Sequence, residues 1–194
     1  MNICTAAVRH LATALLLLAG ATVQAASLTL VPSATAVATN SVFTVGLKLD
    51  AMNAPGAHPG LYGGEILVSF DKTLLNYGGF TLASGVSYFS APAVSTAGNT
   101  QTVHLGFDNA ADLGTVGTFS FTAIGNAGST AAIGLTDADD FSGSFASYTP
   151  TYQRFYPTFT PTQVAVVPLP ASLWLLGTAL GGIAVRRRFR RAAD

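Results

Sequence analysis

Three aspartates, Asp137, Asp139 and Asp140, form the only acidic cluster of this 194-residue chain. Carboxylates at alternate positions of a loop suit Ca²⁺, which takes about six to eight oxygen ligands. An EF-hand loop would also need a glycine and a distant glutamate at fixed positions, and both are missing. The cluster therefore has two interpretations, a solvated turn, which we favour, and a weak Ca²⁺ site. We expect no other cofactor.

Side chains for catalysis are sparse in the rest of the chain. Beyond residue 25 there are two histidines, His58 in a loop of prolines and glycines and His104 on the outward face of a predicted strand. A triad or a zinc site would need partners that the sequence does not place beside them. The chain has no G-x-S-x-G elbow, Walker motif, dinucleotide-binding glycine pattern or C-x-x-C pair. We expect no enzymatic activity and no catalytic residue.

The elements that would position these side chains are predicted to be strands. Apolar and polar residues alternate at period two across residues 26–147, most clearly from Phe43 to Leu49, with breaker-rich turns between the runs. About eight or nine short strands at this spacing are typical of an antiparallel β-sandwich or jelly roll. We expect residues 32–40 to form a turn or spacer, and residues 148–166 to form a final strand or a linker.

Part of this pattern resembles the cohesin family. The resemblance rests on Phe43-Thr44-Val45, on the stretch from Tyr62 to Leu75, and on Phe119 to Ala123 followed by the run from Gly128 to Leu135. Cohesins are β-sandwich modules that pair with dockerins. The resemblance implies a cohesin-like fold and a binding role towards a protein or glycan, although likeness of fold does not establish the partner.

An aromatic and proline-rich stretch precedes the C-terminal tail. Its aromatic members are Tyr148, Tyr152, Phe155, Tyr156 and Phe159. Aromatic side chains stack on sugar faces and also pack in protein interiors. We favour a last strand with an extended linker here over a glycan platform.

The charge balance of the chain between its two termini argues against nucleic-acid binding. Between Ala26 and Val167 there are three Lys or Arg residues against eight Asp or Glu residues, which leaves a net charge of −5. An acidic surface repels phosphate backbones and anionic headgroups. We expect no nucleic-acid partner.

The N-terminus reads as a secretory signal. Residues 1–25 contain Arg9, a short apolar run with four consecutive leucines, and small residues before Ala26. We expect export through the Sec machinery, cleavage by signal peptidase, and a mature chain that starts at Ala26. Cys4 is the only cysteine and lies inside this signal, so the mature chain has no disulfide.

The C-terminus reads as a membrane segment. Residues 169–185 carry no charge, and as a helix they would be about 25 Å long, close to the roughly 30 Å of a bilayer core. The positive-inside rule keeps the residues beyond them cytoplasmic and leaves the domain on the periplasmic side. Those residues are the arginines Arg186, Arg187, Arg188, Arg190 and Arg191.

The order of parts in residues 167–194 resembles the PEP-CTERM family of sorting signals. The motif here is Val167-Pro168-Leu169-Pro170-Ala171, of the VPLPA type, with Leu169 where the commonest form has glutamate. The resemblance implies processing by an exosortase of a Gram-negative bacterium and an association with exopolysaccharide or biofilm. A plain single-pass anchor is the alternative.

Two functions follow from these features. The first hypothesis is an exported cell-surface or extracellular-matrix structural protein, sorted through its tail. The second is a cohesin-like binding module for a protein or glycan partner. Both place the domain outside the cytoplasm.

Overall fold

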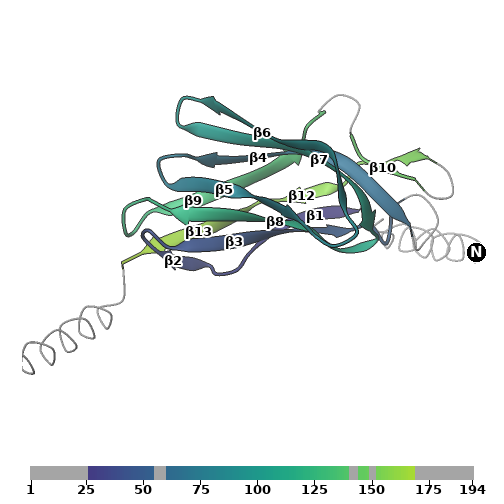
Figure 1. The fold of residues 1–194 in the computed structure, drawn as a ribbon. Helices are drawn as coiled ribbons and strands as arrows, with labels where there is room; N and C mark the ends of the chain where they lie inside the picture. The colour runs from purple at the N-terminus through teal and green to yellow at the C-terminus, as the bar shows by residue number, and fades with distance from the viewer. Residues whose placement is uncertain (1–25, 55–59, 140–143, 149–151, 169–194) are drawn as a thin grey trace, which may run out of the picture.

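The computed structural model describes residues 26–54, 60–139, 144–148 and 152–168. Within these ranges the chain is all-β, with thirteen strands arranged as two packed sheets (Figure 1). No helix in the described ranges is long and apolar enough to cross a bilayer. The predicted signal sequence and the predicted membrane segment lie outside these ranges.

The first sheet, sheet A, has five strands in the order β12-β1-β3-β8-β5. Its neighbours pair antiparallel except β12 with β1, which run parallel. The strands of sheet A are β1 (Ser27–Pro32), β3 (Val42–Asp50), β5 (Leu75–Leu82), β8 (Leu113–Ala123) and β12 (Thr158–Thr160).

The second sheet, sheet B, is built around β4. Strand β7 pairs along the whole of β4 and carries β6 on its other side, while β10 and β9 share the opposite edge of β4. Strand β9 continues to β13 and β2, and β10 continues to β11. The strands of sheet B are β2 (Ala36–Ala38), β4 (Leu61–Asp71), β6 (Ser87–Ala97), β7 (Thr100–Ala111), β9 (Thr130–Asp137), β10 (Ala146–Ser147), β11 (Gln153–Arg154) and β13 (Thr162–Val167).

The core lies between the two sheets and follows the predicted alternation. On β3, Phe43 and every second residue to Leu49 are buried, and the residues between them are exposed or half-buried. Phe121 of β8 packs on Phe43 at 5.8 Å and on Phe70 of β4 at 5.1 Å between ring centroids. Such pairs add about 0.5–1.5 kcal/mol each to the burial of their area, so the aromatic cluster joins sheet A to sheet B.

Two segments differ from the simplest expectation. Within the predicted turn at residues 32–40, Ala36–Ala38 form β2, which pairs parallel with β13. The stretch at 148–166, predicted as a strand or a linker, supplies β11, β12 and most of β13. Phe155, Val164 and Val166 of this stretch are buried in the common core. The C-terminal segment therefore contributes strands to both sheets.

Gly63 and Gly64 occupy a β-bulge, since the register of β4 against β7 shifts between Tyr62 and Gly64. The ring of Phe145 lies where a side chain at Gly64 would begin. Only glycine lets the ring approach the backbone so closely. The bulge thus provides the space for Phe145, the residue directly before β10.

Candidate binding face

The outer face of sheet B presents rows of small and polar side chains across four strands. Residues directly opposite each other in a ladder project on the same face. The registers therefore align Ala93 of β6, His104 of β7, Leu67 of β4 and Thr136 of β9 in one row. These four side chains are exposed or half-buried. The face is a broad surface that a partner could cover.

Glu65 and His104 form a pair on this face. His104 Nε2 lies 3.7 Å from Glu65 Oε2, and the two side chains are 40% and 26% exposed, respectively. The outward orientation predicted for His104 is therefore confirmed. Nε2 is itself covered and has no hydrogen-bond partner among the described residues. Among the described residues no hydroxyl or thiol donates to that nitrogen, so none of them makes the nucleophile–base contact of a triad with His104.

Phe89 of β6 is the aromatic residue of this face, and its side chain is 70% exposed. A Cβ at Gly106 would lie 3.0 Å from Phe89 Cδ1 and 3.0 Å from Glu65 Cγ. Phe89 and Glu65 therefore meet over a glycine of β7. The sequence carries no signal for this exposure, because Phe89 lies where the register of β6 against β7 shifts, between Tyr88 and Ser90.

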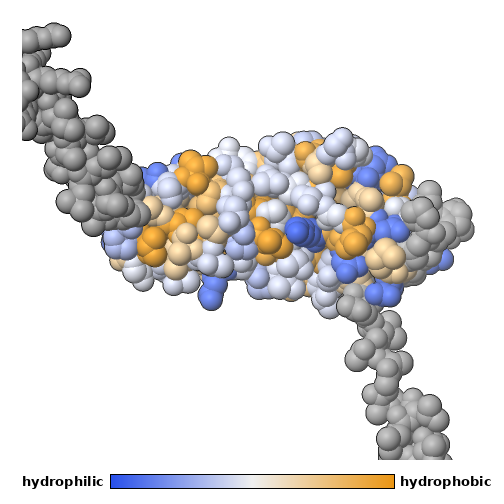
Figure 2. Space-filling view, turned by 90° about the horizontal axis from the view of Figure 1, so that it is seen from below, coloured by the Kyte–Doolittle hydropathy of each residue, from blue (hydrophilic) through white to orange (hydrophobic). Residues whose placement is uncertain are grey.

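The outer face of sheet A is different in kind. Its ladder rows carry mainly hydroxyl side chains, such as Thr44 of β3 opposite Ser120 of β8. Figure 2 views the molecule from below Figure 1, the side on which β2 of sheet B and β3 of sheet A lie, and shows a largely pale surface with separate hydrophobic and hydrophilic patches. The exposed aromatic residues of the described ranges lie on β6 or around β10 and β11, in sheet B: Tyr88, Phe89, Tyr148, Tyr152 and Tyr156. Sheet B is therefore the better candidate for binding.

Sheet B is also acidic. Glu65 and Asp108 lie on its strands, and Arg154 is the one Lys or Arg that the described residues place on them. Lys48 lies on β3 of sheet A. A field of one sign over a face favours partners of the opposite sign, so we expect a partner surface with positive charge.

Of the predicted Ca²⁺ candidates, Asp137 and Asp139 take part in hydrogen bonds of the loop after β9. Asp137 Oδ1 accepts a hydrogen bond from the Asp139 amide at 2.9 Å, and the Ser144 hydroxyl lies 2.7 Å away. Ser144 Oγ in turn accepts from the Glu65 amide at 2.8 Å. Asp137 thus ties the chain to β4, while Asp140 lies outside the described residues. Within the described ranges no three His, Cys, Asp or Glu residues are grouped to hold a metal.

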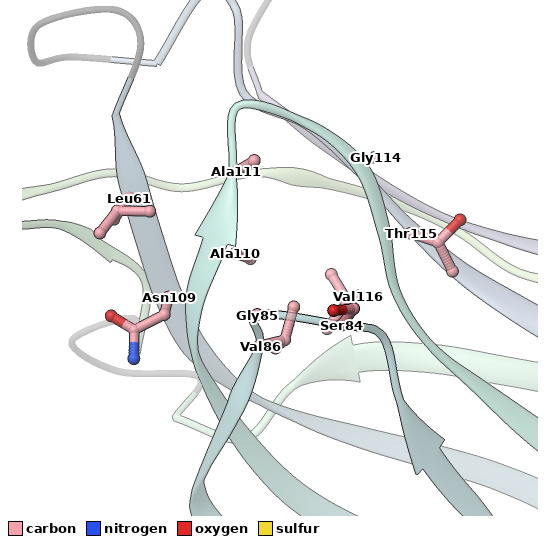
Figure 3. A pocket seen from close by; sticks show the side chains of 10 residues that line it. All are labelled: Leu61, Ser84, Gly85, Val86, Asn109, Ala110, Ala111, Gly114, Thr115 and Val116. Atoms are coloured by element: carbon pink, nitrogen blue, oxygen red, sulfur yellow. The ribbon is translucent and has the colours of Figure 1, made fainter.

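A hollow of about 450 Å³ lies at the end of the sandwich where β4 begins (Figure 3). Asn109 has a left-handed backbone, φ 62°, and its Nδ2 donates to Ser87 Oγ at 2.8 Å. Figure 3 shows Thr115 set apart from the other lining side chains. The described residues of the lining include no acid, base or thiol: Leu61, Ser84, Gly85, Val86, Asn109, Ala110, Ala111, Gly114, Thr115 and Val116. This hollow therefore offers shape without reactive groups.

The structure describes only the start of the predicted sorting motif. Val167 ends β13 and Pro168 follows it, whereas Leu169, Pro170, Ala171 and the arginine cluster lie outside the described ranges. His58 also lies outside them. The sorting and membrane predictions therefore stay predictions.

Comparison with known proteins identifies the fold of the chain through solved structures, and not through its sequence. No protein-family model matches the chain, and no curated protein matches its sequence. A cohesin module from a family 33 glycoside hydrolase of Clostridium perfringens aligns with a TM-score of 0.55 and 11% identity, covering 75% of this chain and 99% of the module. The seventh ScaB type I cohesin of Pseudobacteroides cellulosolvens aligns with a TM-score of 0.53 and 10% identity, covering 74% and 94%. The predicted cohesin-like β-sandwich is confirmed.

Proposed function

We propose that this chain is an exported, non-catalytic binding module that engages a protein partner through the outer face of sheet B. The observation that carries the proposal is the exposed ring of Phe89 beside the Glu65–His104 pair, on a cohesin-like sandwich. An exposed aromatic anchor with charged groups around it is the composition of an interaction hot spot. Cohesins pair with dockerins, which supports a protein as the partner.

The partner that fits this face combines an apolar pocket with basic side chains. The pocket would receive Phe89, and the basic groups would face Glu65 and Asp108. Charge pairs at an interface set orientation and association rate more than affinity. Binding should therefore weaken at high salt and depend on Phe89 for its lifetime.

The test uses the full chain, purified in detergent and immobilised, with envelope extract of its source cells as the analyte. The wild-type chain should bind a protein of the extract saturably. Phe89→Ala should weaken this binding about tenfold, which corresponds to a loss of about 1.4 kcal/mol of binding free energy at a hot-spot aromatic residue. Glu65→Lys should slow association. The matched control is Val42→Ala on sheet A, since Val42 is 68% exposed and Phe89 is 70% exposed. Equal retention by wild type and Phe89→Ala would contradict the proposal.

Export and sorting form a second part of the proposal. We infer that residues 1–25 direct secretion and that residues 167–194 act as a PEP-CTERM-type signal read by an exosortase, with delivery to the cell surface and an association with exopolysaccharide. The supports are the order of motif, uncharged run and arginines in the sequence. Intact mass and C-terminal sequencing of the protein recovered from cells test this. A C-terminus at Asp194 would leave a plain single-pass anchor.

A further inference from the structure

Three exposed polar side chains lie in and beside β11. Tyr152, Arg154 and Tyr156 stand two residues apart along the chain, and Phe155 between the last two is buried. Tyr152 and Tyr156 are 61% and 66% exposed. The two phenols are four residues apart in the chain. We call these three residues the tyrosine tape.

The core holds the tape in this orientation. Phe155, between Arg154 and Tyr156, is 5% exposed and points the other way. Its ring meets Tyr62 edge-on at 5.7 Å and Phe145 at 5.8 Å, and its amide donates to the Phe145 carbonyl at 3.1 Å. Because Phe155 is anchored in the interior, its two neighbours must face outwards.

A third ring extends the tape towards β4. Tyr148 lies 6.1 Å from Tyr152 between ring centroids, at 60°. A Cβ at Gly63 would lie 3.0 Å from the Tyr148 ring, so the phenol rests on the bulge of β4. Burial, with a smaller effect of the Asp108 carboxylate, raises the pKa of Tyr148. The phenol therefore keeps its proton as a donor.

Hydrogen-bonding groups flank the rings. A hydrogen bond to Tyr152 is the main cause that raises the pKa of Arg154, so guanidinium and phenol are held together. A hollow of about 280 Å³ lies beside Tyr156 and is lined by Thr136, Asp137, Asp139, Tyr156, Pro157 and Phe159. Flat rings with phenol tips thus stand next to carboxylates and a guanidinium.

We propose that the tyrosine tape and the hollow beside Tyr156 bind a carbohydrate chain. Sugar rings offer C–H faces that stack on aromatic rings, and hydroxyls that pair with carboxylate, phenol and guanidinium groups. The exposed phenols of Tyr152 and Tyr156 and the Arg154 guanidinium, next to the Asp137 and Asp139 carboxylates of the hollow, supply stacking faces and hydrogen-bonding groups close together, as a polymer rich in hydroxyls requires. The site uses neither Phe89 nor Glu65 and does not rest on the protein-binding proposal.

The test measures binding of the full chain in detergent to three immobilised polymers: a neutral glucan, an amino-sugar polymer and a polyuronate. Wild type should bind at least one of them, and Tyr152→Ala/Tyr156→Ala should raise the Kd about tenfold through loss of two stacking rings. Arg154→Ala should weaken binding to the polyuronate more than to the neutral glucan. Thermal unfolding of each variant confirms that the fold is intact.

The matched control is Phe89→Ala, an exposed aromatic on β6. It should leave polymer binding unchanged while it weakens capture of the envelope protein, so failure of one proposal is distinguishable from failure of the other. Absence of binding to all three polymers would overturn the carbohydrate site. The site would also be overturned if Tyr152→Ala/Tyr156→Ala bound the polymers as tightly as wild type does, or if this double variant lost only its binding to the envelope protein.

Discussion

The main-chain carbonyl of Val167 accepts a hydrogen bond from the amide of Thr39 at 3.2 Å. The first residue of the predicted sorting motif is therefore the last residue of β13, paired with Ala38 of β2. In the sequence, the predicted membrane run starts at Leu169, two residues later. The motif thus begins inside the folded sheet, and no spacer separates Val167 from the uncharged run.

The first prediction concerns this last strand. Val164 and Val166 are 0% and 1% exposed, so Val164→Ala or Val166→Ala should lower the free energy of unfolding by about 2 kcal/mol through lost burial and a residual cavity. Chemical denaturation measures the change. The control is Gln163→Ala, an exposed position of the same strand. If all three variants unfold alike, residues 162–167 are a linker and not part of the core.

A second prediction rests on a buried hydroxyl. Tyr77 Oη is buried and has no hydrogen-bond partner among the described residues, while its ring packs on Phe121 at 5.9 Å. Tyr77→Phe keeps the ring and removes the unpaired group, so it should stabilise the protein by about 1 kcal/mol. Thermal and denaturant unfolding at neutral pH measure the gain. A loss of stability would mean that the hydroxyl has a bonding partner.

The same residue predicts a pH dependence. Burial, with a smaller effect of Tyr88, raises the pKa of Tyr77 from 10.0 to about 12. Above pH 10 the unfolded chain releases this proton while the folded chain keeps it, so the unfolded state gains. Stability present below pH 10 should therefore fall between pH 10 and about 12. Tyr77→Phe should show a shallower fall over that window, and parallel curves for the two proteins would contradict the assignment.

The long strands can be predicted from the sequence because buried and exposed residues alternate along them. Val103, Leu105 and Phe107 alternate with half-exposed Thr102 and His104 and do form β7. Short strands give no such signal. Ala36–Ala38 form β2 through pairing with β13, a contact about 130 residues away along the chain. Three residues cannot display a period, so tertiary pairing decides their structure.

The candidate sites were harder to foresee for a related reason. The composition of the stretch around Tyr152 and Tyr156 was visible, but which rings face solvent depends on Phe155 entering the core. Phe89 faces outwards because β6 shifts register twice against β7. Bulges move side chains from one face to the other, and a single sequence does not show where they fall.

A fourth prediction concerns the turn between β4 and β5. The Thr73 hydroxyl donates to Asp71 Oδ1 at 2.6 Å and the Thr73 amide at 2.8 Å, and these bonds lower the pKa of Asp71. Because the pKa of Asp71 is lower in the folded chain than its ordinary value of 3.8, the ionised carboxylate stabilises the turn above pH 3.8. This stabilisation is lost as the pH falls through the pKa of the folded state. Thr73→Ala should move the Asp71 midpoint upwards in an NMR titration of side-chain carboxyls. Asp50 is the internal reference, and an unmoved Asp71 would contradict the hydroxyl as the main cause.

The last prediction tests the bulge that supports both the loop after β9 and the tyrosine tape. A Cβ at Gly64 would overlap the ring of Phe145, which is 1% exposed and contacts both Phe155 and Phe107. Gly64→Ala should therefore destabilise the protein by about 1–3 kcal/mol, as overpacked cores do. Gly114→Ala is the matched control, since nothing lies within 4 Å of its added Cβ. Gly64→Ala/Phe145→Leu should recover part of the loss, because the smaller side chain leaves room for the methyl group. If Gly64→Ala is as stable as Gly114→Ala, Phe145 does not pack on the bulge, and the anchoring of Phe155 beside it would fail as well.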